Sequence, residues 1–266
     1  MKNLQELNEE LLLANKELKE RNTELLRSNN ELTSFNYIAS HDLQEPLRKI
    51  QVFISRIFED KDLVLSDKNK DYFNKMQASA NRMQILIDNL LAYSKVNGTH
   101  KIFEKVNLNF ILDNVLNELA QTATIEDNKA TIKHAALPEI KGIPFQLKQL
   151  FTNLIDNALK YGHPERNTVI DIQSVVVEGK DIDDPRADKK KSSSNTTFAD
   201  NGMGFEQEYA EKIFALFQRL HDKQSFSGTG IGLAICKKVA ENHAGFMSAS
   251  SVLNEGATFS IYIPTL

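Results

Sequence analysis

The chain has 266 residues, a length that suits about two domains of ordinary size. Its formal net charge is −4 at pH 7, which gives no electrostatic case for nucleic-acid binding. Cys236 is the only cysteine, which excludes a disulfide framework and a cysteine-rich metal site. No apolar run is long enough to span a bilayer and no secretory signal is visible, so we expect a cytoplasmic chain, with any membrane sensor lying upstream.

Residues 1–35 predict a long helix with a seven-residue repeat. Leucine falls at position d and asparagine at position a of each heptad: Leu4, Leu11, Leu18, Leu25 and Leu32, then Asn8, Asn15, Asn22, Asn29 and Asn36. Leucine at d with buried asparagine at a favours a parallel dimer in fixed register, at a cost in stability. We expect a coiled coil. The alternative is a solvated helix that dimerises only because the rest of the chain does.

Residues 36–100 predict a helical hairpin. The heptad register continues through Leu43, Ile50 and Ile57 until the polar stretch "EDKDLVLSDKN" ends it, and a second helix stops at Asn97-Gly98. Two helices cannot bury such wide apolar stripes alone, whereas two hairpins from two chains can do so as a four-helix bundle. We therefore expect a homodimer.

His41 falls at the outermost heptad position, f, in the setting "SHDLQEPLRKI", where Pro46 is expected to kink the helix. A neutral imidazole can accept a phosphoryl group when a carboxylate holds its other N–H. Glu45 is the helical neighbour four residues on, and Asp42 would have to reach across about 100° of the helix. Geometry alone favours Glu45, and an idle surface histidine is the alternative to both.

From about Phe103 the heptads stop, and strands mix with helices in the pattern of an α+β two-layer sandwich. The stretch "EGKDIDDPRADKKKSSSN" reads as a solvated loop or hairpin tip with no functional signal. The helix at 146–161 carries a polar stripe of Asn153, Asn157, Lys160 and Tyr161. An amide oxygen there can complete a Mg²⁺ shell, and a lysine can meet phosphate, although a solvated helix face would look the same.

Two glycine motifs follow. In "DNGMGF", Asp200 comes directly after a strand, where it could accept a hydrogen bond from an adenine amine, and Gly202 and Gly204 would let a ligand approach the backbone. An ordinary Asx turn has the same pattern. In "GTGIGLA", glycines open a helix whose bare N–H groups suit phosphate: Gly228, Gly230 and Gly232. The spacing is not that of a dinucleotide-binding turn, and no Walker A loop is present.

Between these motifs lie Phe214 and Phe217, which could anchor a segment closing over nucleotide or simply pack in the core. His41, the helix at 146–161 with its two asparagines, the two glycine motifs and the paired phenylalanines occur in a characteristic order. In this combination the chain resembles the sensor histidine kinases over about residues 34–266. The variants "SHDLQEPLR" and "LFQRLH" look most like the phytochrome-associated branch. The resemblance implies a dimerisation and histidine phosphotransfer domain (36–100) and a gyrase-like catalytic ATP-binding domain (101–266). The coiled-coil signalling helix that the heptads predict (1–35) precedes them.

That resemblance implies phosphorylation of His41 from MgATP, with Asp42 as the partner of the ring, and transfer to an aspartate of a response regulator. It further implies Asn157 as the Mg²⁺ ligand, Asp200 as the adenine-reading acid and Thr258 in "GATF" as a residue near the adenine. Glu45 stands where many members carry Thr or Asn, which puts phosphatase activity in doubt. Alternatives are a catalytically inactive nucleotide-binding dimeric scaffold and a gyrase-like ATPase.

Overall fold

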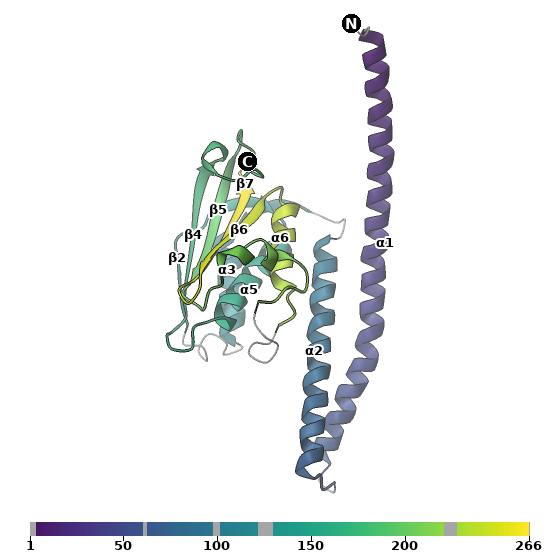
Figure 1. Cartoon of the computed structure of the whole chain (residues 1–266), viewed down its shortest axis with the longest axis vertical. Helices are drawn as coiled ribbons and strands as arrows, with labels where there is room; N and C mark the ends of the chain where they lie inside the picture. Colours follow the sequence, from purple (N-terminus) through teal and green to yellow (C-terminus); the bar gives the residue numbers. More distant parts are fainter. Residues whose placement is uncertain (1–3, 61–62, 98–101, 122–129, 221–227, 266) are drawn as a thin grey trace. The chain divides into compact units, whose positions relative to one another are not determined.

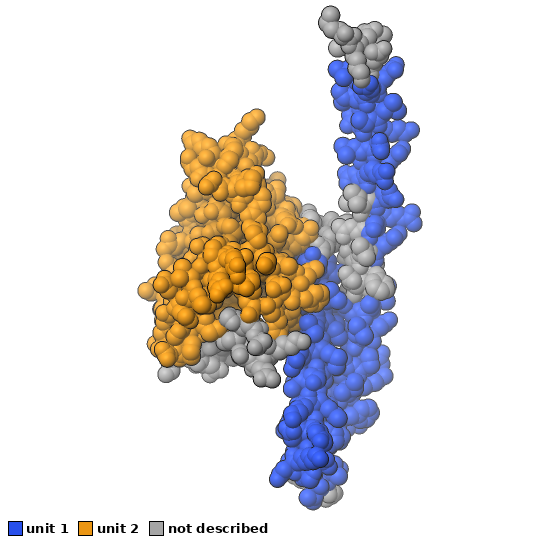
Figure 2. All heavy atoms as spheres, in the orientation of Figure 1, with its two compact units in different colours: residues 1–99 blue, residues 100–266 orange. Residues whose placement is uncertain are grey.

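The computed structural model describes residues 4–60, 63–97, 102–121, 130–220 and 228–265. The chain divides into two compact units, Met1–Thr99 and His100–Leu266, which Figure 2 colours separately. Each unit has its own packed interior, and each is described by itself below.

The first unit is a hairpin of two helices, α1 (Leu4–Glu59) and α2 (Asp67–Asn97), drawn in Figure 1. Both helices were predicted from the heptads, and α1 continues through Pro46 to Glu59. Gly98, predicted to stop α2, lies outside the described residues. Polar side chains join the two helices, with Gln44 Nε2 2.9 Å from Asp88 Oδ1 and Gln51 Nε2 3.0 Å from Asn81 Oδ1.

The hairpin leaves part of its apolar surface uncovered in the single chain. Leu47 and Ile54 of α1 and Ala80 of α2 are buried, but many apolar side chains of the same helices are exposed, among them Leu43, Ile50, Phe53, Met76 and Met83. Many large apolar side chains exposed on one helical hairpin indicate an association surface. The predicted four-helix bundle of a homodimer would cover it.

The second unit is an α+β sandwich with one layer of strands and one of helices, as the sequence predicted (Figure 1). Its main sheet has the strand order β2-β4-β5-β7-β6, formed by Thr131–His134, Val169–Glu178, Ser192–Asp200, Gly256–Pro264 and Phe246–Val252. The pair β2 and β4 is parallel, and the other three pairs are antiparallel. A separate antiparallel pair joins β1 (Glu104–Asn107) to β3 (Glu139–Gly142).

The helical layer consists of α3 (Leu108–Gln121), α5 (Pro144–Lys160) and α6 (Gly232–Asn242). The apolar stripe of α5 recurs at helical spacing, so Leu147, Leu150 and Leu154 are all buried. Phe151 of α5 packs edge-on against Phe198 of β5, with ring centroids 5.0 Å apart. This contact fixes α5, the helix that carries Asn153 and Asn157, against the centre of the sheet.

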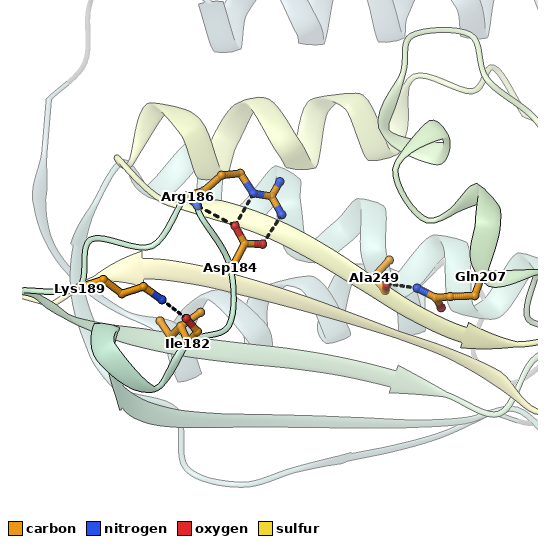
Figure 3. Close-up of polar contacts among 6 residues, drawn as sticks. All are labelled: Ile182, Asp184, Arg186, Lys189, Gln207 and Ala249. Atoms are coloured by element: carbon orange, nitrogen blue, oxygen red, sulfur yellow. Dashed lines mark hydrogen bonds and ion pairs between the residues drawn. The ribbon is translucent and has the colours of Figure 1, made fainter.

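The charged stretch after β4 is an ordered hairpin tip. Arg186 donates from Nε and Nη2 to the two oxygens of Asp184, at 2.9 and 2.7 Å, and Lys189 donates to the carbonyl of Ile182 (Figure 3). The same guanidinium lies 4.9 Å from the ring centroid of Phe246. Hydrogen bonding from Arg186 lowers the pKa of Asp184, so this ion pair stays charged at neutral pH.

Candidate functional site

His41 lies on the exposed surface of α1, as its heptad position predicted, with 71% of its side chain accessible. Its Nδ1 is 3.3 Å from Asp42 Oδ1, whereas Glu45 forms an ion pair with Lys49 at 2.7 Å. The hydrogen bond from Lys49 lowers the pKa of Glu45. The local helical argument for Glu45 omitted this competing cation one turn further on, and in the structure Asp42 is the carboxylate beside the ring.

A pocket in the second unit gathers residues from five segments of the chain. Its walls come from α5 and its end, from the end of β5 with the loop after it, from residues 213–220, from α6 and from β7: Asn157, Tyr161, Asp200, Gly204, Phe205, Ile213, Gln218, Arg219, Leu220, Leu233, Ala257 and Phe259. Four of these were predicted from the sequence, namely Asn157, Tyr161, Asp200 and Gly204. Most of the wall surface is apolar, and a few polar side chains converge on it, as in a small-molecule site.

Asp200 ends β5 and faces this pocket. Its Oδ1 accepts hydrogen bonds from the N–H of Gly202 at 2.8 Å and from the N–H of Ala257 at 3.4 Å. Burial raises the pKa of the carboxyl, and the two backbone donors oppose that rise. Both donors bind the same oxygen, so the geometry fixes the direction of the carboxylate plane.

The polar stripe of α5 meets the second glycine motif. Asn153 Nδ2 donates to the carbonyl of Gly232 at 3.3 Å, and Lys160 Nζ donates to Tyr161 Oη at 2.8 Å. A methyl group built at Gly228 would lie 2.1 Å from Lys160 Nζ, so this glycine and the ammonium are in direct contact. The structure thus brings Asn153 to Gly232 and Lys160 to Gly228, in two contacts next to the wall residues Tyr161 and Leu233.

The glycines of the first motif are required by close backbone approach. Gly204 has φ +58°, and a Cβ there would lie 2.2 Å from the carbonyl oxygen of Val252. A Cβ at Gly202 would lie 2.5 Å from the carbonyl of Tyr161. In the second motif, Gly230 has φ +71°. Any side chain at these three positions would displace the loops that form the wall.

Seven predicted residues do not belong to the pocket wall, namely Asn153, Lys160, Gly202, Gly228, Gly230, Gly232 and Thr258. Side chains alternate along a strand, so Ala257 and Phe259 of β7 face the pocket and Thr258 points to the other side of the sheet.

The paired phenylalanines, Phe214 and Phe217, differ in their burial. Phe214 is buried, whereas Phe217 is 59% exposed with φ +63° and lies against Gly230.

Two side chains, Gln207 of the segment after β5 and Ser251 of β6, anchor the wall to β6. The side-chain amide of Gln207 donates to the carbonyl of Ala249 at 3.2 Å (Figure 3), and its oxygen accepts from the N–H of Ser251 at 2.8 Å. Ser251 Oγ in turn accepts from the N–H of Phe205 at 2.8 Å. Phe205 is thereby held in the wall by residues that no sequence motif indicated.

The chain matches known proteins in both units. A family model for the His Kinase A (phospho-acceptor) domain matches residues 31–99, and one for the histidine kinase-, DNA gyrase B- and HSP90-like ATPase matches residues 142–266. Together with the fold and the site, these matches define a phospho-acceptor hairpin followed by a gyrase-like ATPase domain. The chain belongs to the sensor histidine kinases.

Its relatives include phytochromes. The chain is 38% identical over 231 residues to cyanobacterial phytochrome A from Nostoc sp., a match that covers 86% of this chain and 28% of the relative. It is 28% identical over 267 residues to the signal transduction histidine-protein kinase BarA from Escherichia coli, covering 98% of this chain and 28% of that protein. The chain thus spans less than a third of the length of these relatives.

Two solved structures share the fold. Full-length ShkA in complex with AMPPNP has a TM-score of 0.62 at 19% identity, covering 86% of this chain and 45% of that one. Histidine kinase ThkA in complex with the response regulator protein TrrA has a TM-score of 0.56 at 22% identity, covering 95% of this chain and 66% of that one. Within the described residues, no helix is both long and apolar enough for a membrane span.

Proposed function

We propose that this chain is a protein-histidine kinase that phosphorylates its own His41 from MgATP and passes the phosphoryl group to an aspartate of a response regulator. The observation that carries the proposal is the pocket in which Asp200 and Asn157 share one wall, next to Lys160 and Gly228. ShkA, which has this fold, was crystallised with an ATP analogue, and ThkA with a response regulator.

In this proposal the pocket residues bind and orient ATP. The Asp200 carboxylate accepts a hydrogen bond from the adenine amine, while Phe205, Ile213 and Phe259 exclude water from the base. Lys160 and the N–H groups at the start of α6 neutralise phosphate charge. Positioning and charge neutralisation of this kind supply most of the acceleration in phosphoryl transfer.

The same residues fit a magnesium ion. The described residues contain no cluster of three or more His, Cys, Asp or Glu side chains that could hold a metal by themselves. Mg²⁺ commonly keeps several waters and binds through substrate phosphates with one or two protein oxygens. We assign this role to the side-chain oxygen of Asn157, because Asn157 lines the pocket, and the ion would neutralise the phosphate oxygens.

His41 is the proposed nucleophile. With its Nδ1 proton donated to Asp42, the lone pair of Nε2 is available to attack the γ-phosphorus, and ADP leaves with the bridging oxygen. Asp42 keeps the imidazole in that tautomer, and it stabilises the positive charge that develops on the ring. We further propose that the chain works as a cytoplasmic homodimer joined by the bundle and the heptads, with an upstream sensor domain.

The test is incubation of the purified chain with γ-labelled ATP and Mg²⁺. His41→Gln should abolish the label, which should be acid-labile and alkali-stable, whereas His134→Gln, a change at another exposed histidine, should keep it. Both variants should still bind ATP, because neither residue lies in the pocket. ATP binding without any label in the parent chain would favour the nucleotide-binding scaffold, and label persisting in His41→Gln would mean another acceptor.

A further inference from the structure

Arg166 joins the loop after β5, which contributes to the pocket wall, to a second loop that follows β6. It is an exposed residue of the segment between α5 and β4, in a stretch, "HPERNT", that no motif marks. Its Nε donates to the carbonyl of Asn201 at 2.8 Å, and its Nη2 donates to the carbonyls of Gly202, at 3.0 Å, and of Asn254. One guanidinium therefore bridges the loop after β5 and the turn between β6 and β7.

The contact with Asn201 acts on Asp200 through a single peptide group. The carbonyl of Asn201 and the N–H of Gly202 belong to the same planar amide, so they point in opposite directions. Arg166 binds the oxygen end at 2.8 Å, and Asp200 Oδ1 accepts from the nitrogen end at 2.8 Å. The positively charged guanidinium of Arg166, bonded to the carbonyl oxygen, also polarises this amide. The N–H of Gly202 thereby becomes a stronger hydrogen-bond donor to the carboxylate.

Other bonds tie the same loop down. The side chain of Asn201 accepts from the N–H of Val169 at 2.8 Å, and the N–H of Met203 donates to the carbonyl of Tyr161 at 2.9 Å. The N–H of Asn254 donates to the carbonyl of Met203 at 2.6 Å. These neutral bonds place the loop, and Arg166 adds a charged donor to the peptide that directs Asp200.

We infer that Arg166 is a positioning residue for nucleotide binding, which orients the Asp200 carboxylate towards the adenine amine through the Asn201–Gly202 peptide. This inference rests on the proposed function, because it needs a base in the pocket. Arg166 itself is not part of the pocket wall, so in this inference it acts through Asp200. Its loss therefore weakens recognition of the base and leaves the phosphoryl-transfer step intact once the site is saturated.

The test compares ATP and GTP binding to the full chain and to Arg166→Ala, Arg166→Lys and Arg186→Ala. Arg186 is the matched control, since it is also an exposed arginine with a bidentate acceptor, yet it lies at the β4–β5 tip (Figure 3). Arg166→Ala should raise the Kd for ATP about tenfold, the loss of one hydrogen bond to a charged group. Arg166→Lys, which cannot reach three carbonyls at once, should fall between Arg166→Ala and the parent.

Base selectivity separates positioning from simple stabilisation. If Arg166 orients Asp200, the preference for ATP over GTP narrows in Arg166→Ala, while the rate of His41 labelling at saturating ATP changes by less than about threefold. Arg186→Ala should lower the Tm as much or more and leave both Kd values unchanged. A Kd within about twofold of the parent in Arg166→Ala, or an unchanged ATP preference, would overturn the inference.

The controls also separate this inference from the proposed function. If the parent chain bound no ATP, the proposed function would fail first. If the parent bound and labelled normally and Arg166→Ala did the same, only the inference about Arg166 would fail. Because Arg166 is exposed, the variants should fold, and far-UV circular dichroism with a thermal melt verifies this for each one.

Discussion

His41 Nδ1 lies 3.3 Å from Asp42 Oδ1, although the two residues are adjacent on one helix. Neighbours in sequence ordinarily diverge by about 100° around a helix. Here the short aspartate side chain reaches across to the ring, while Glu45, which lies on the same helical face as His41, bonds to Lys49. The carboxylate that lies beside the ring is thus the one that simple helical spacing disfavoured.

The first prediction concerns these two acids. Asp42→Asn should slow His41 phosphorylation by about 100-fold at saturating ATP, because the amide cannot hold the imidazole N–H as a carboxylate does. Glu45→Gln removes a charge of equal size and should leave the rate within about threefold. Single-turnover labelling with γ-labelled ATP measures both. Equal loss in the two variants would show that net charge near His41 matters, and not the hydrogen bond.

The second prediction concerns two glycines of the nucleotide motifs. Gly204→Ala should destabilise the second unit by about 1–3 kcal/mol, because Gly204 has φ +58° and its added methyl would overlap the carbonyl of Val252. Gly232→Ala should be tolerated, since the nearest atom, in the side chain of Asn153, lies 3.7 Å from the added carbon at the start of α6. Urea unfolding of both variants measures the change in the free energy of unfolding. An unchanged free energy of unfolding in Gly204→Ala would contradict this prediction.

The third prediction concerns the asparagines of α5. Asn157 lies on the pocket wall, whereas Asn153 bonds to the carbonyl of Gly232. In the parent, Mg²⁺ should tighten ATP binding relative to EDTA, and Asn157→Ala should remove most of that difference. Asn153→Ala should keep the Mg²⁺ effect even if it binds ATP less tightly. Calorimetric titration with ATP, with and without Mg²⁺, is the measurement. If Mg²⁺ tightened ATP binding to Asn157→Ala as much as to the parent, Asn157 would not be the Mg²⁺ ligand.

Local periodicity predicted the helices well because their signal is contained in the segment itself. The stripe of Leu147, Leu150 and Leu154 gives α5 directly, and the heptads give α1. The four-residue strands β2 and β3 were not predicted, because their partners, β4 and β1, lie tens of residues away. A short strand with one fully buried side chain, such as Ile140 in β3, carries almost no pattern of its own.

The site divides in the same way. Asp200, Gly204 and Asn157 belong to compact motifs, so the sequence indicated them. Ala257 reaches the pocket only because β7 pairs with β5 in a register that sets it opposite Asp200. Thr258 was predicted from the family resemblance alone, and the sequence does not show which face a strand presents. Arg166 was missed because an exposed arginine in a turn looks like any other solvated charge.

The fourth prediction follows from the raised pKa of Asp200. Burial favours the protonated form of this carboxyl in the folded chain, so keeping it ionised at neutral pH costs stability in the absence of ligand. Asp200→Asn removes that cost and can still accept the N–H of Gly202. The variant should therefore melt no lower than the parent at neutral pH, and its advantage should shrink as pH falls towards 3.8, the ordinary pKa of aspartate. ATP binding should be lost throughout.

The last prediction concerns the asparagines at the a positions of α1. Asn15 and Asn22 are exposed in the single chain, in the same helix as the exposed Leu11 and Leu18 at d. If the heptads pair two chains, Asn15→Ile with Asn22→Ile places apolar side chains in the seam and should tighten the dimer, since buried asparagine fixes register at a cost in stability.

Sedimentation equilibrium measures that change, and the matched control is Glu17→Gln with Glu24→Gln, which alters two polar positions of the same helix outside a and d. A tighter dimer in the isoleucine variant alone supports pairing through the heptads. Because the asparagines would keep the seam marginal, the same variant should also change the labelling rate of His41, as a signalling helix biased towards one packing would. An unchanged dimer dissociation constant in the isoleucine variant would mean that residues 1–35 of α1 form a solvated helix that does not pair with its copy.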